Sequence, residues 1–161
     1  MREEFKNEPL ADFSDPEVRR KMEDALAEVK GWFGREYPLV IGGDEVWTDQ
    51  RFESLNPSRP SEVVGVFCKA SEKDAEAALD AAWKAFEKWR FETPQKRADL
   101  LFRAAELLRE RRFILDAAMV LEVGKSWIEA DADVAEAIDF LEYYGREALR
   151  LAGPARLTQI P

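Results

Sequence analysis

The amino-acid sequence predicts a mainly helical α+β chain in which short β-hairpins are followed by long helices. Apolar residues recur at helical spacing before residue 34 and after residue 71, whereas short strand-like runs interrupted by glycine and proline occupy the segment between them. The composition, with 46% hydrophobic and 35% charged residues, is typical of a folded globular protein. At 161 residues, the chain is long enough to form the core of one ordinary domain.

The first helix is expected over about residues 15–33, after a polar leader. Ser14-Asp15-Pro16-Glu17 contains the pieces of a capping box and a proline suited to the first helical turn. Gly34 can adopt the left-handed conformation that often ends a helix. The apolar residues at helical spacing are Val18, Met22, Ala25, Leu26, Val29, Trp32 and Phe33. Residues 1–37 are therefore interpreted as a leader and a helix.

Short strands are expected over residues 38–70. Residues 39–41 and 46–47 flank Gly42-Gly43, which is the pattern of a β-hairpin with a glycine turn. Residues 51–55 and 62–69 are two further strand candidates. They are separated by a loop with two prolines, which cannot donate ladder hydrogen bonds.

Helices are expected from Ser71 onward. Ser71 begins a cap sequence, Thr93-Pro94 restarts the helical pattern, and Gly124 and Gly153-Pro154 are helix-ending signals. The final helix shows apolar or small residues at steps of four and three, namely Val134, Ile138, Leu141, Gly145 and Ala148.

Charge and residue usage exclude several classes of function. The chain carries 33 acidic and 24 basic residues, so its formal charge of −9 disfavours nucleic acid and anionic lipid as partners. The polar start and the lack of an apolar run of 18 residues predict a cytoplasmic chain without a membrane segment. The absence of histidine removes the commonest general base and metal ligand, and no metal site is expected.

Two local patterns resemble catalytic motifs but have better structural interpretations. Gly124-Lys125-Ser126 resembles the end of a phosphate-binding loop, yet Met119 stands where that loop needs a glycine, so a helix C-cap is favoured. Cys68 could be a nucleophile, but it lies in an apolar strand-like run, which favours a packed, inert thiol. No G-x-G-x-x-G dinucleotide motif is present.

Two side-chain clusters leave alternatives open. The last helix carries the carboxylates Asp131, Asp133, Glu136, Asp139 and Glu142. Paired carboxylates can act as acid and base, but a solvated face is the commoner outcome, and Glu136 lies about 200° around the helix from Val134 and Ile138. Trp83, Phe86 and Trp89 are interpreted as core or inter-subunit packing rather than a ligand-binding cluster.

Taken in order, these features resemble the amino-terminal part of the aldehyde dehydrogenase superfamily. The stretches that carry the resemblance are Leu39-Val40-Ile41-Gly42-Gly43, Ser54-Leu55-Asn56-Pro57, residues 75–89 ending in Ala-Phe-x-x-Trp, residues 97–111, and Glu122-Val123-Gly124-Lys125. Phe5-Lys6-Asn7-Glu8-Pro9 and residues 134–144 further resemble the bacterial 1-pyrroline-5-carboxylate dehydrogenases, also called L-glutamate gamma-semialdehyde dehydrogenases. The resemblance covers nearly the whole chain.

The resemblance implies an α/β, aldehyde dehydrogenase-like fold and NAD-dependent oxidation of glutamate semialdehyde to glutamate in proline breakdown. In that family a cysteine nucleophile forms a thiohemiacetal, and hydride passes to the nicotinamide. The catalytic cysteine, the carboxylate base, the oxyanion-hole asparagine and the nucleotide-binding strands all lie beyond the position matching Pro161. Cys68 does not match the nucleophile. Among the substrate-tunnel residues, only the glutamate beside the aldehyde-binding end falls within this chain, at Glu136.

The resemblance therefore predicts an amino-terminal fragment, with residues 38–161 as the first part of the aldehyde dehydrogenase domain, truncated before its cofactor-binding strands and catalytic domain. We expect no catalytic, cofactor-binding or metal-binding residue in it, no NAD binding by the chain alone, and no activity alone. Its amphipathic helices would lack the sheet that covers them in the family, which predicts self-association, rearranged helices or marginal stability. The partners expected are a second copy of the chain or the remaining part of the dehydrogenase. A non-enzymatic interaction module is the alternative, and an independent enzyme of different chemistry is disfavoured.

Overall fold

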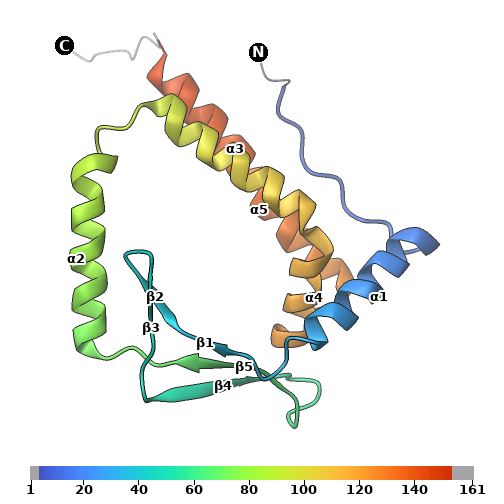
Figure 1. Ribbon diagram of the computed structural model, residues 1–161. Coiled ribbons are helices and arrows are strands. Elements are labelled where there is room, and N and C mark those ends of the chain that lie inside the picture. The colour runs from blue at the N-terminus through green and yellow to red at the C-terminus, as the bar shows by residue number, and fades with distance from the viewer. Residues whose placement is uncertain (1–3, 154–161) are drawn as a thin grey trace, which may run out of the picture.

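The computed structural model describes residues 4–153, which form five helices and five short strands (Figure 1). The elements in chain order are α1 (Pro16–Lys30), β1 (Glu36–Tyr37), β2 (Leu39–Ile41), β3 (Asp44–Val46), β4 (Arg51–Leu55), β5 (Val63–Cys68), α2 (Glu72–Trp89), α3 (Pro94–Glu110), α4 (Arg112–Val123) and α5 (Trp127–Ala152). The predicted class, short strands followed by long helices, is confirmed. None of the described helices is both long enough and apolar enough to span a bilayer.

Helix α1 begins and ends slightly differently from the sequence prediction. Asp15, rather than Ser14, is the N-cap, and its carboxylate accepts the backbone N–H of Glu17 at 2.7 Å. The helix ends at Lys30, three residues before the predicted end, and residues 31–34 form turns that finish with Gly34 at a φ of 74°. The glycine therefore supplies the left-handed backbone one turn beyond the helix.

The strands form two small sheets. Strands β2 and β3 form the predicted antiparallel hairpin, whose turn glycines Gly42 and Gly43 have φ values of 63° and 98°. The other sheet has the order β1-β5-β4, in which β5 pairs antiparallel with β4 and parallel with β1. Strand β1 was not predicted, so strand structure begins at residue 36 rather than at residue 38.

Side-chain caps fix the boundaries of the later helices. Ser71 and Asp74 form a capping box at α2, Thr93 caps α3, and Ser126 forms a second capping box with Glu129 at α5. Gly124 ends α4 in the left-handed conformation, with a φ of 78°. This confirms the C-cap interpretation of Gly124-Lys125-Ser126 and leaves Ser126 to begin the next helix.

The helices bury two apolar clusters on the side of the molecule opposite α2 (Figure 1). The first joins α1 to α4 and contains Met22, Ala25, Val29, Ala117 and Leu121. The second joins α3 to α5 and contains Ala105, Val134 and Ile138. Helices α3 and α5 run alongside each other, and the chain before α1 extends along them (Figure 1). This arrangement places the leader next to α5.

Helix α2 stands apart from these clusters and contains no buried residue (Figure 1). Leu79 is 62% exposed and Trp83 67% exposed, so they form an open apolar face together with the half-exposed rings of Phe86 and Trp89. The core-packing alternative for the aromatic cluster is therefore wrong within the described residues. Its remaining alternative, packing against another subunit, stays a prediction.

Candidate functional site

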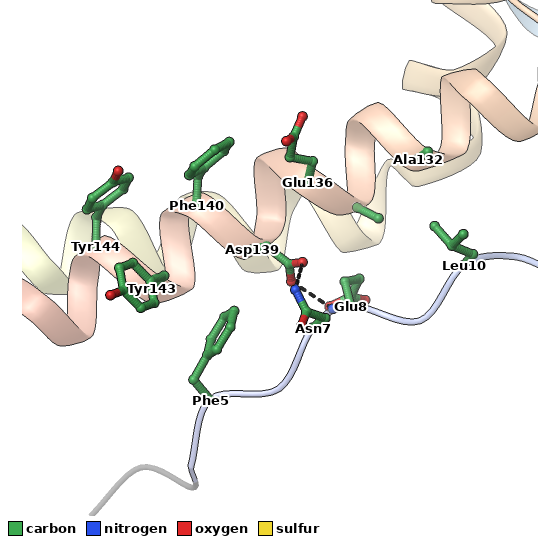
Figure 2. A pocket seen from close by; sticks show the side chains of 11 residues that line it. Phe5, Asn7, Glu8, Leu10, Ala132, Glu136, Asp139, Phe140, Tyr143 and Tyr144 are labelled. Atoms are coloured by element: carbon green, nitrogen blue, oxygen red, sulfur yellow. Dashed lines mark hydrogen bonds between the residues drawn. The ribbon is translucent and has the colours of Figure 1, made fainter.

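The main pocket lies between the extended leader and α5 and has a volume of about 540 Å³ (Figure 2). Its walls come from the leader, through Phe5, Asn7, Glu8 and Leu10, and from α5, through Ala132, Ala135, Glu136, Asp139, Phe140, Tyr143 and Tyr144. Three adjacent pairs of helical residues recur every four positions, namely Ala135 and Glu136, Asp139 and Phe140, and Tyr143 and Tyr144, so two neighbouring faces of α5 supply the helical wall. The polar leader of the sequence is thus a structural part of the site.

Asp139 fastens the leader to α5 at the centre of the pocket. Its two carboxylate oxygens accept the side-chain amide of Asn7 at 2.6 Å and the backbone N–H of Glu8 at 2.7 Å (Figure 2). Hydrogen bonds to a charged carboxylate are stronger than those between neutral groups. Asp139 therefore determines how closely the leader approaches the helix.

Aromatic rings close one end of the pocket. The ring of Phe5 meets Tyr143 edge-on at a centroid distance of 5.6 Å, and Phe140 stacks on Tyr144 at 5.8 Å. Both geometries are favourable for aromatic pairs. This end of the pocket can hold an apolar or flat ligand group.

Glu136 lies on α5 within the wall of this pocket, and it is exposed (Figure 2). Ala132 and Phe140 lie one turn before and one turn after it on the same face. The prediction that Glu136 faces away from the apolar stripe is confirmed, since Val134 and Ile138 are buried. Its carboxylate points away from the leader, on the same side of α5 as Phe140 and Tyr144 (Figure 2), where it can accept a hydrogen bond from, or attract a positive charge on, a bound molecule.

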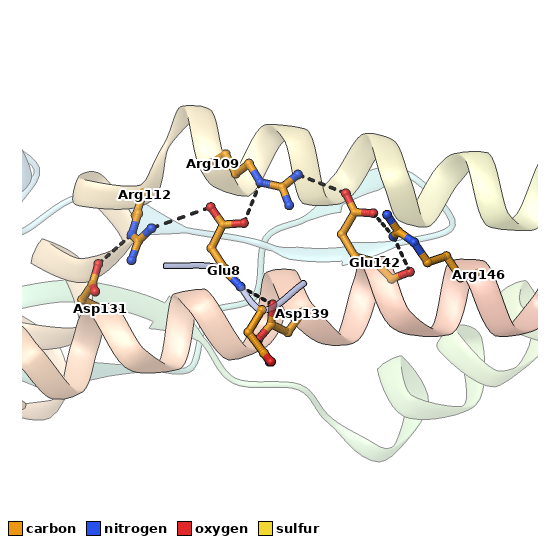
Figure 3. Close-up of polar contacts among 8 residues, drawn as sticks. Glu8, Arg109, Arg112, Asp131, Asp139, Glu142 and Arg146 are labelled. Carbon is orange, nitrogen blue, oxygen red and sulfur yellow. Dashed lines mark hydrogen bonds and ion pairs between the residues drawn. The ribbon is translucent and has the colours of Figure 1, made fainter. Parts of the chain in front are cut away.

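Behind the pocket, a chain of largely buried carboxylates and their arginine partners joins the leader, α3, α4 and α5 (Figure 3). Glu8 accepts from Arg109 at 2.9 Å and lies 3.8 Å from Arg112. Arg112 also contacts Asp131 at 2.6 Å, and Asp131 is 1% exposed. These pairs hold the leader on the side opposite its contact with Asp139.

Glu142 is the second buried carboxylate of this network. It pairs with Arg109 at 3.1 Å and with Arg146, one turn later on α5. Burial alone would raise the pKa of Glu142, but the hydrogen bonds from Arg146 and Arg109 outweigh it and lower the pKa below its ordinary value. Glu142 is therefore a charged structural anchor at neutral pH.

The solvated-face interpretation of the α5 carboxylates is wrong for Asp131 and Glu142, which are 1% and 8% exposed. Their arginine partners lie on α3 and α4, many residues earlier in the chain, and no periodic pattern on α5 alone reveals them. The i,i+4 spacing of Glu142 and Arg146 was the available signal. Asp133, by contrast, pairs with Lys125 near the start of the helix.

Cys68 is buried at the end of β5, as predicted for a packed thiol. Its sulfur accepts the backbone N–H of Thr48 at 3.4 Å, and this hydrogen bond lowers the pKa of the thiol. The sequence did not predict this lowered pKa, because Thr48 lies on a loop whose path depends on the fold. At 5% exposure the sulfur has little access to a substrate.

Comparison with known proteins gives the site its context. The family model described as "Aldehyde dehydrogenase family" matches residues 46–160. The chain belongs to the aldehyde dehydrogenase family. A curated relative named 1-pyrroline-5-carboxylate dehydrogenase from Bacillus pumilus is 49% identical over 148 residues, which cover 92% of this chain and 29% of the relative. The chain therefore spans less than a third of the length of that aldehyde dehydrogenase.

Solved aldehyde dehydrogenase structures share the fold. A 1-pyrroline-5-carboxylate dehydrogenase from Thermus, crystallised with bound NAD, is 54% identical, with a TM-score of 0.92 over 99% of this chain and 31% of that protein. The proline utilization A protein of Bdellovibrio bacteriovorus is 40% identical, with a TM-score of 0.93 over 98% of this chain and 16% of that protein. The described part of this chain thus has the fold of the corresponding part of these longer proteins.

The described residues of this chain do not fit NAD as a complete site. A dinucleotide carries a negatively charged diphosphate, which proteins hold with glycine-rich loops, helix N-termini or basic side chains. The lining of the main pocket instead contributes the carboxylates of Glu8, Glu136 and Asp139 and no lysine or arginine. Within residues 4–153, no group of three or more Cys, Asp or Glu side chains is placed to hold a metal ion.

Proposed function

We propose that this chain is the amino-terminal portion of an NAD-dependent L-glutamate gamma-semialdehyde (1-pyrroline-5-carboxylate) dehydrogenase, and that it is inactive alone. The observation that carries the proposal is the match to the Thermus dehydrogenase, with 54% identity and a TM-score of 0.92 over 99% of the chain. Identity at this level, over 99% of the chain, supports a shared substrate class. The leader matters here because it forms one wall of the main pocket.

Inactivity alone follows from the chemistry that the site offers. Hydride transfer requires the reactive carbon of the cofactor to be held against the substrate at near-attack distance. The described residues supply a pocket wall of carboxylates and aromatic rings, but neither a diphosphate site nor an accessible nucleophile. NAD, when bound to the longer dehydrogenase, accepts the hydride. This chain contributes to that enzyme by shaping one side of the substrate pocket.

The direct test of inactivity is to incubate the purified chain with NAD and glutamate semialdehyde and to follow NADH absorbance. We expect no NADH formation above that in buffer. Turnover above buffer would contradict the proposed inactivity.

Glu136 is assigned to the substrate pocket and can be tested in a chimaera. This chain replaces the matched amino-terminal part of the Thermus dehydrogenase, and NADH formation is measured for the parent chimaera and for Glu136→Gln. We expect Glu136→Gln to lower kcat/KM for the semialdehyde and to leave the KM for NAD unchanged. The control, Glu76→Gln, removes the same charge from an exposed position on α2. Equal kinetics in Glu136→Gln and Glu76→Gln would remove Glu136 from the site.

A second candidate function, docking to another protein without catalysis, is favoured by the open apolar face of α2. Leu79, Ala82, Trp83 and Phe86 line a shallow hollow there, and three of these side chains are large and exposed. Exposed apolar patches of this kind mark interaction surfaces. Self-association of the chain and association with the remaining part of a dehydrogenase are both consistent with this face.

A further inference from the structure

One buried carboxyl group has no role in the pocket. Asp116 lies on α4, it is completely buried, and neither of its carboxylate oxygens has a hydrogen-bond partner in the described structure. A buried, unpaired charge is among the most costly arrangements in a protein. The protonated form of Asp116 avoids that cost.

The charged groups around Asp116 form one cluster. From α5, Asp131 brings a second carboxylate that is 1% exposed. From α4 itself, Arg112 provides the compensating positive charge, and its buried Nη2 atom has no acceptor. The leader reaches the cluster through Glu8, which pairs with Arg112 (Figure 3). Helix α1 turns apolar residues toward α4, among them Met22 and Val29.

The same cluster holds the leader in place. Asp131 accepts the backbone N–H of Ala11 at 2.8 Å with one oxygen and contacts Arg112 at 2.6 Å with the other. Arg112 in turn lies 3.8 Å from Glu8. Any movement of Arg112 toward Asp116 therefore takes positive charge away from Asp131, which binds the leader at Ala11, and from Glu8, which belongs to the leader.

We propose that Asp116, Arg112 and Asp131 form a pH-sensitive latch, which holds the leader while Asp116 is protonated and loosens it when Asp116 ionises. Loss of the proton to water leaves three carboxylates, those of Asp116, Asp131 and Glu8, around the guanidinium of Arg112. Asp116 and Asp131 then repel each other across the contact between α4 and α5, and Arg112 is shared among the three. The leader loses part of its attachment, and the pocket that it walls opens.

The expected range of pH lies around neutrality. Burial, followed by the charge of Asp131, raises the pKa of Asp116 to about 7, while Arg112 lowers it. The folded chain is therefore mostly protonated at Asp116 below that pH and mostly ionised above it. The latch thus holds in mildly acidic solution and loosens in mildly alkaline solution.

The test measures hydrogen exchange at the N–H of Ala11 in the full chain, expressed as a protection factor so that the pH dependence of the chemistry is removed. Between pH 6 and pH 8, one unit on either side of the expected pKa, the ionised fraction of Asp116 rises about tenfold. We therefore expect the protection factor of the Ala11 N–H to fall by about tenfold in the wild type. In Asp116→Asn, which mimics the protonated form, protection should stay constant. Asp80→Asn, which removes a carboxylate from the exposed surface of α2, should behave as the wild type does.

Two results would overturn the latch. One is a fall in protection that is equal in the wild type and in Asp116→Asn. The other needs no variant: it is a titration midpoint below pH 5 for the Asp116 carboxyl, measured by carbon-13 NMR in the wild type. Asp116 would then already be ionised throughout the range from pH 6 to pH 8. A midpoint near pH 7, together with a fall in protection that occurs in the wild type and not in Asp116→Asn, supports it.

Discussion

Gly145 lies on α5 against Phe102 of α3, and it makes room for that aromatic ring. A Cβ atom added at Gly145 would lie 2.6 Å from Cε1 of Phe102, whose side chain is 1% exposed. Since the ring is enclosed on all sides, it cannot move away without disturbing the packing of the two helices. The glycine is thus required by its neighbour rather than by its backbone conformation.

We therefore expect Gly145→Ala to destabilise the chain even though alanine is the better helix former. Overpacking should cost about 1–3 kcal/mol and exceed the gain of about 1 kcal/mol in helix propensity. Urea unfolding followed by circular dichroism measures the difference. Ala137→Gly, at an exposed position of the same helix, isolates the propensity effect. A more stable Gly145→Ala variant would contradict this account of the contact.

Glu142 compensates two arginines, and its loss leaves both without their shared acceptor. Removing one partner of a fully buried ion pair lowers the free energy of unfolding by about 3–5 kcal/mol. Because the side chain of Arg109 is 38% exposed, we expect a smaller loss of about 2 kcal/mol here. We expect Glu142→Gln to lower the free energy of unfolding by that amount at pH 7. Glu147→Gln, on the same helix and paired with a largely exposed Arg150, should lose far less.

The pH dependence of this effect follows from the lowered pKa of Glu142. Because the folded-state pKa lies below the unfolded one, the stabilisation is fully present above the ordinary glutamate pKa and is lost as the pH falls through the lowered value. Wild type and Glu142→Gln should therefore converge in stability at strongly acidic pH. A difference that persists unchanged from pH 7 to pH 2 would show that packing, not charge, is lost.

At the scale of elements, the best predicted features were those with local causes. The Gly42-Gly43 hairpin, strand β4, the cap at Ser71 and the helix restart at Thr93-Pro94 have signals in residues close together in sequence, and they were predicted from the sequence. Strand β1 was missed because its two residues are ordered only by parallel pairing with β5, thirty residues later along the chain. The leader was missed as a wall of the pocket because an extended polar segment has no period to detect.

The candidate site shows the same division. The exposure of Glu136 followed from helical geometry, whereas its role at the substrate is still a prediction from the family resemblance. The burial of Asp131 and Glu142 depends on arginines that only the packing of α3 and α4 against α5 brings near. Asp131 lies three residues before Val134, and Glu142 lies four residues after Ile138, so helical spacing places both on the buried face of α5, away from Glu136. That spacing does not reveal the arginines of α3 and α4 that pair with them.

Helix α2 should be the least protected helix of the described chain. It buries no residue, whereas α3 and α5 pack against each other along their length. Helices of about 18 residues depend on tertiary packing for most of their stability. Hydrogen exchange should therefore be faster for amides in the middle of α2 than for those in the middle of α3, at equal pH. Equal protection in a dilute, monomeric sample would contradict this expectation.

At the scale of the whole molecule, the apolar face of α2 predicts self-association. Covering exposed apolar surface yields about 25 cal/mol per Å², so a few hundred Å² is enough to drive association at high concentration. We expect the sedimentation coefficient of the wild type to rise with concentration and Leu79→Lys to suppress that rise. Ile128→Lys is the matched control, since Ile128 is 68% exposed and Leu79 is 62% exposed. A wild type that stays monomeric at all concentrations would refute the prediction.

The attachment of the leader through main-chain groups has a consequence for how that segment can vary. Asp139 accepts a hydrogen bond from the backbone N–H of Glu8, and Asp131 accepts one from the backbone N–H of Ala11. Every amino acid except proline has this N–H group. The side chain at position 11 can consequently be exchanged without detaching the leader. Proline there would remove a hydrogen-bond donor that no neighbouring residue replaces. Position 11 should therefore accept many different amino acids but not proline.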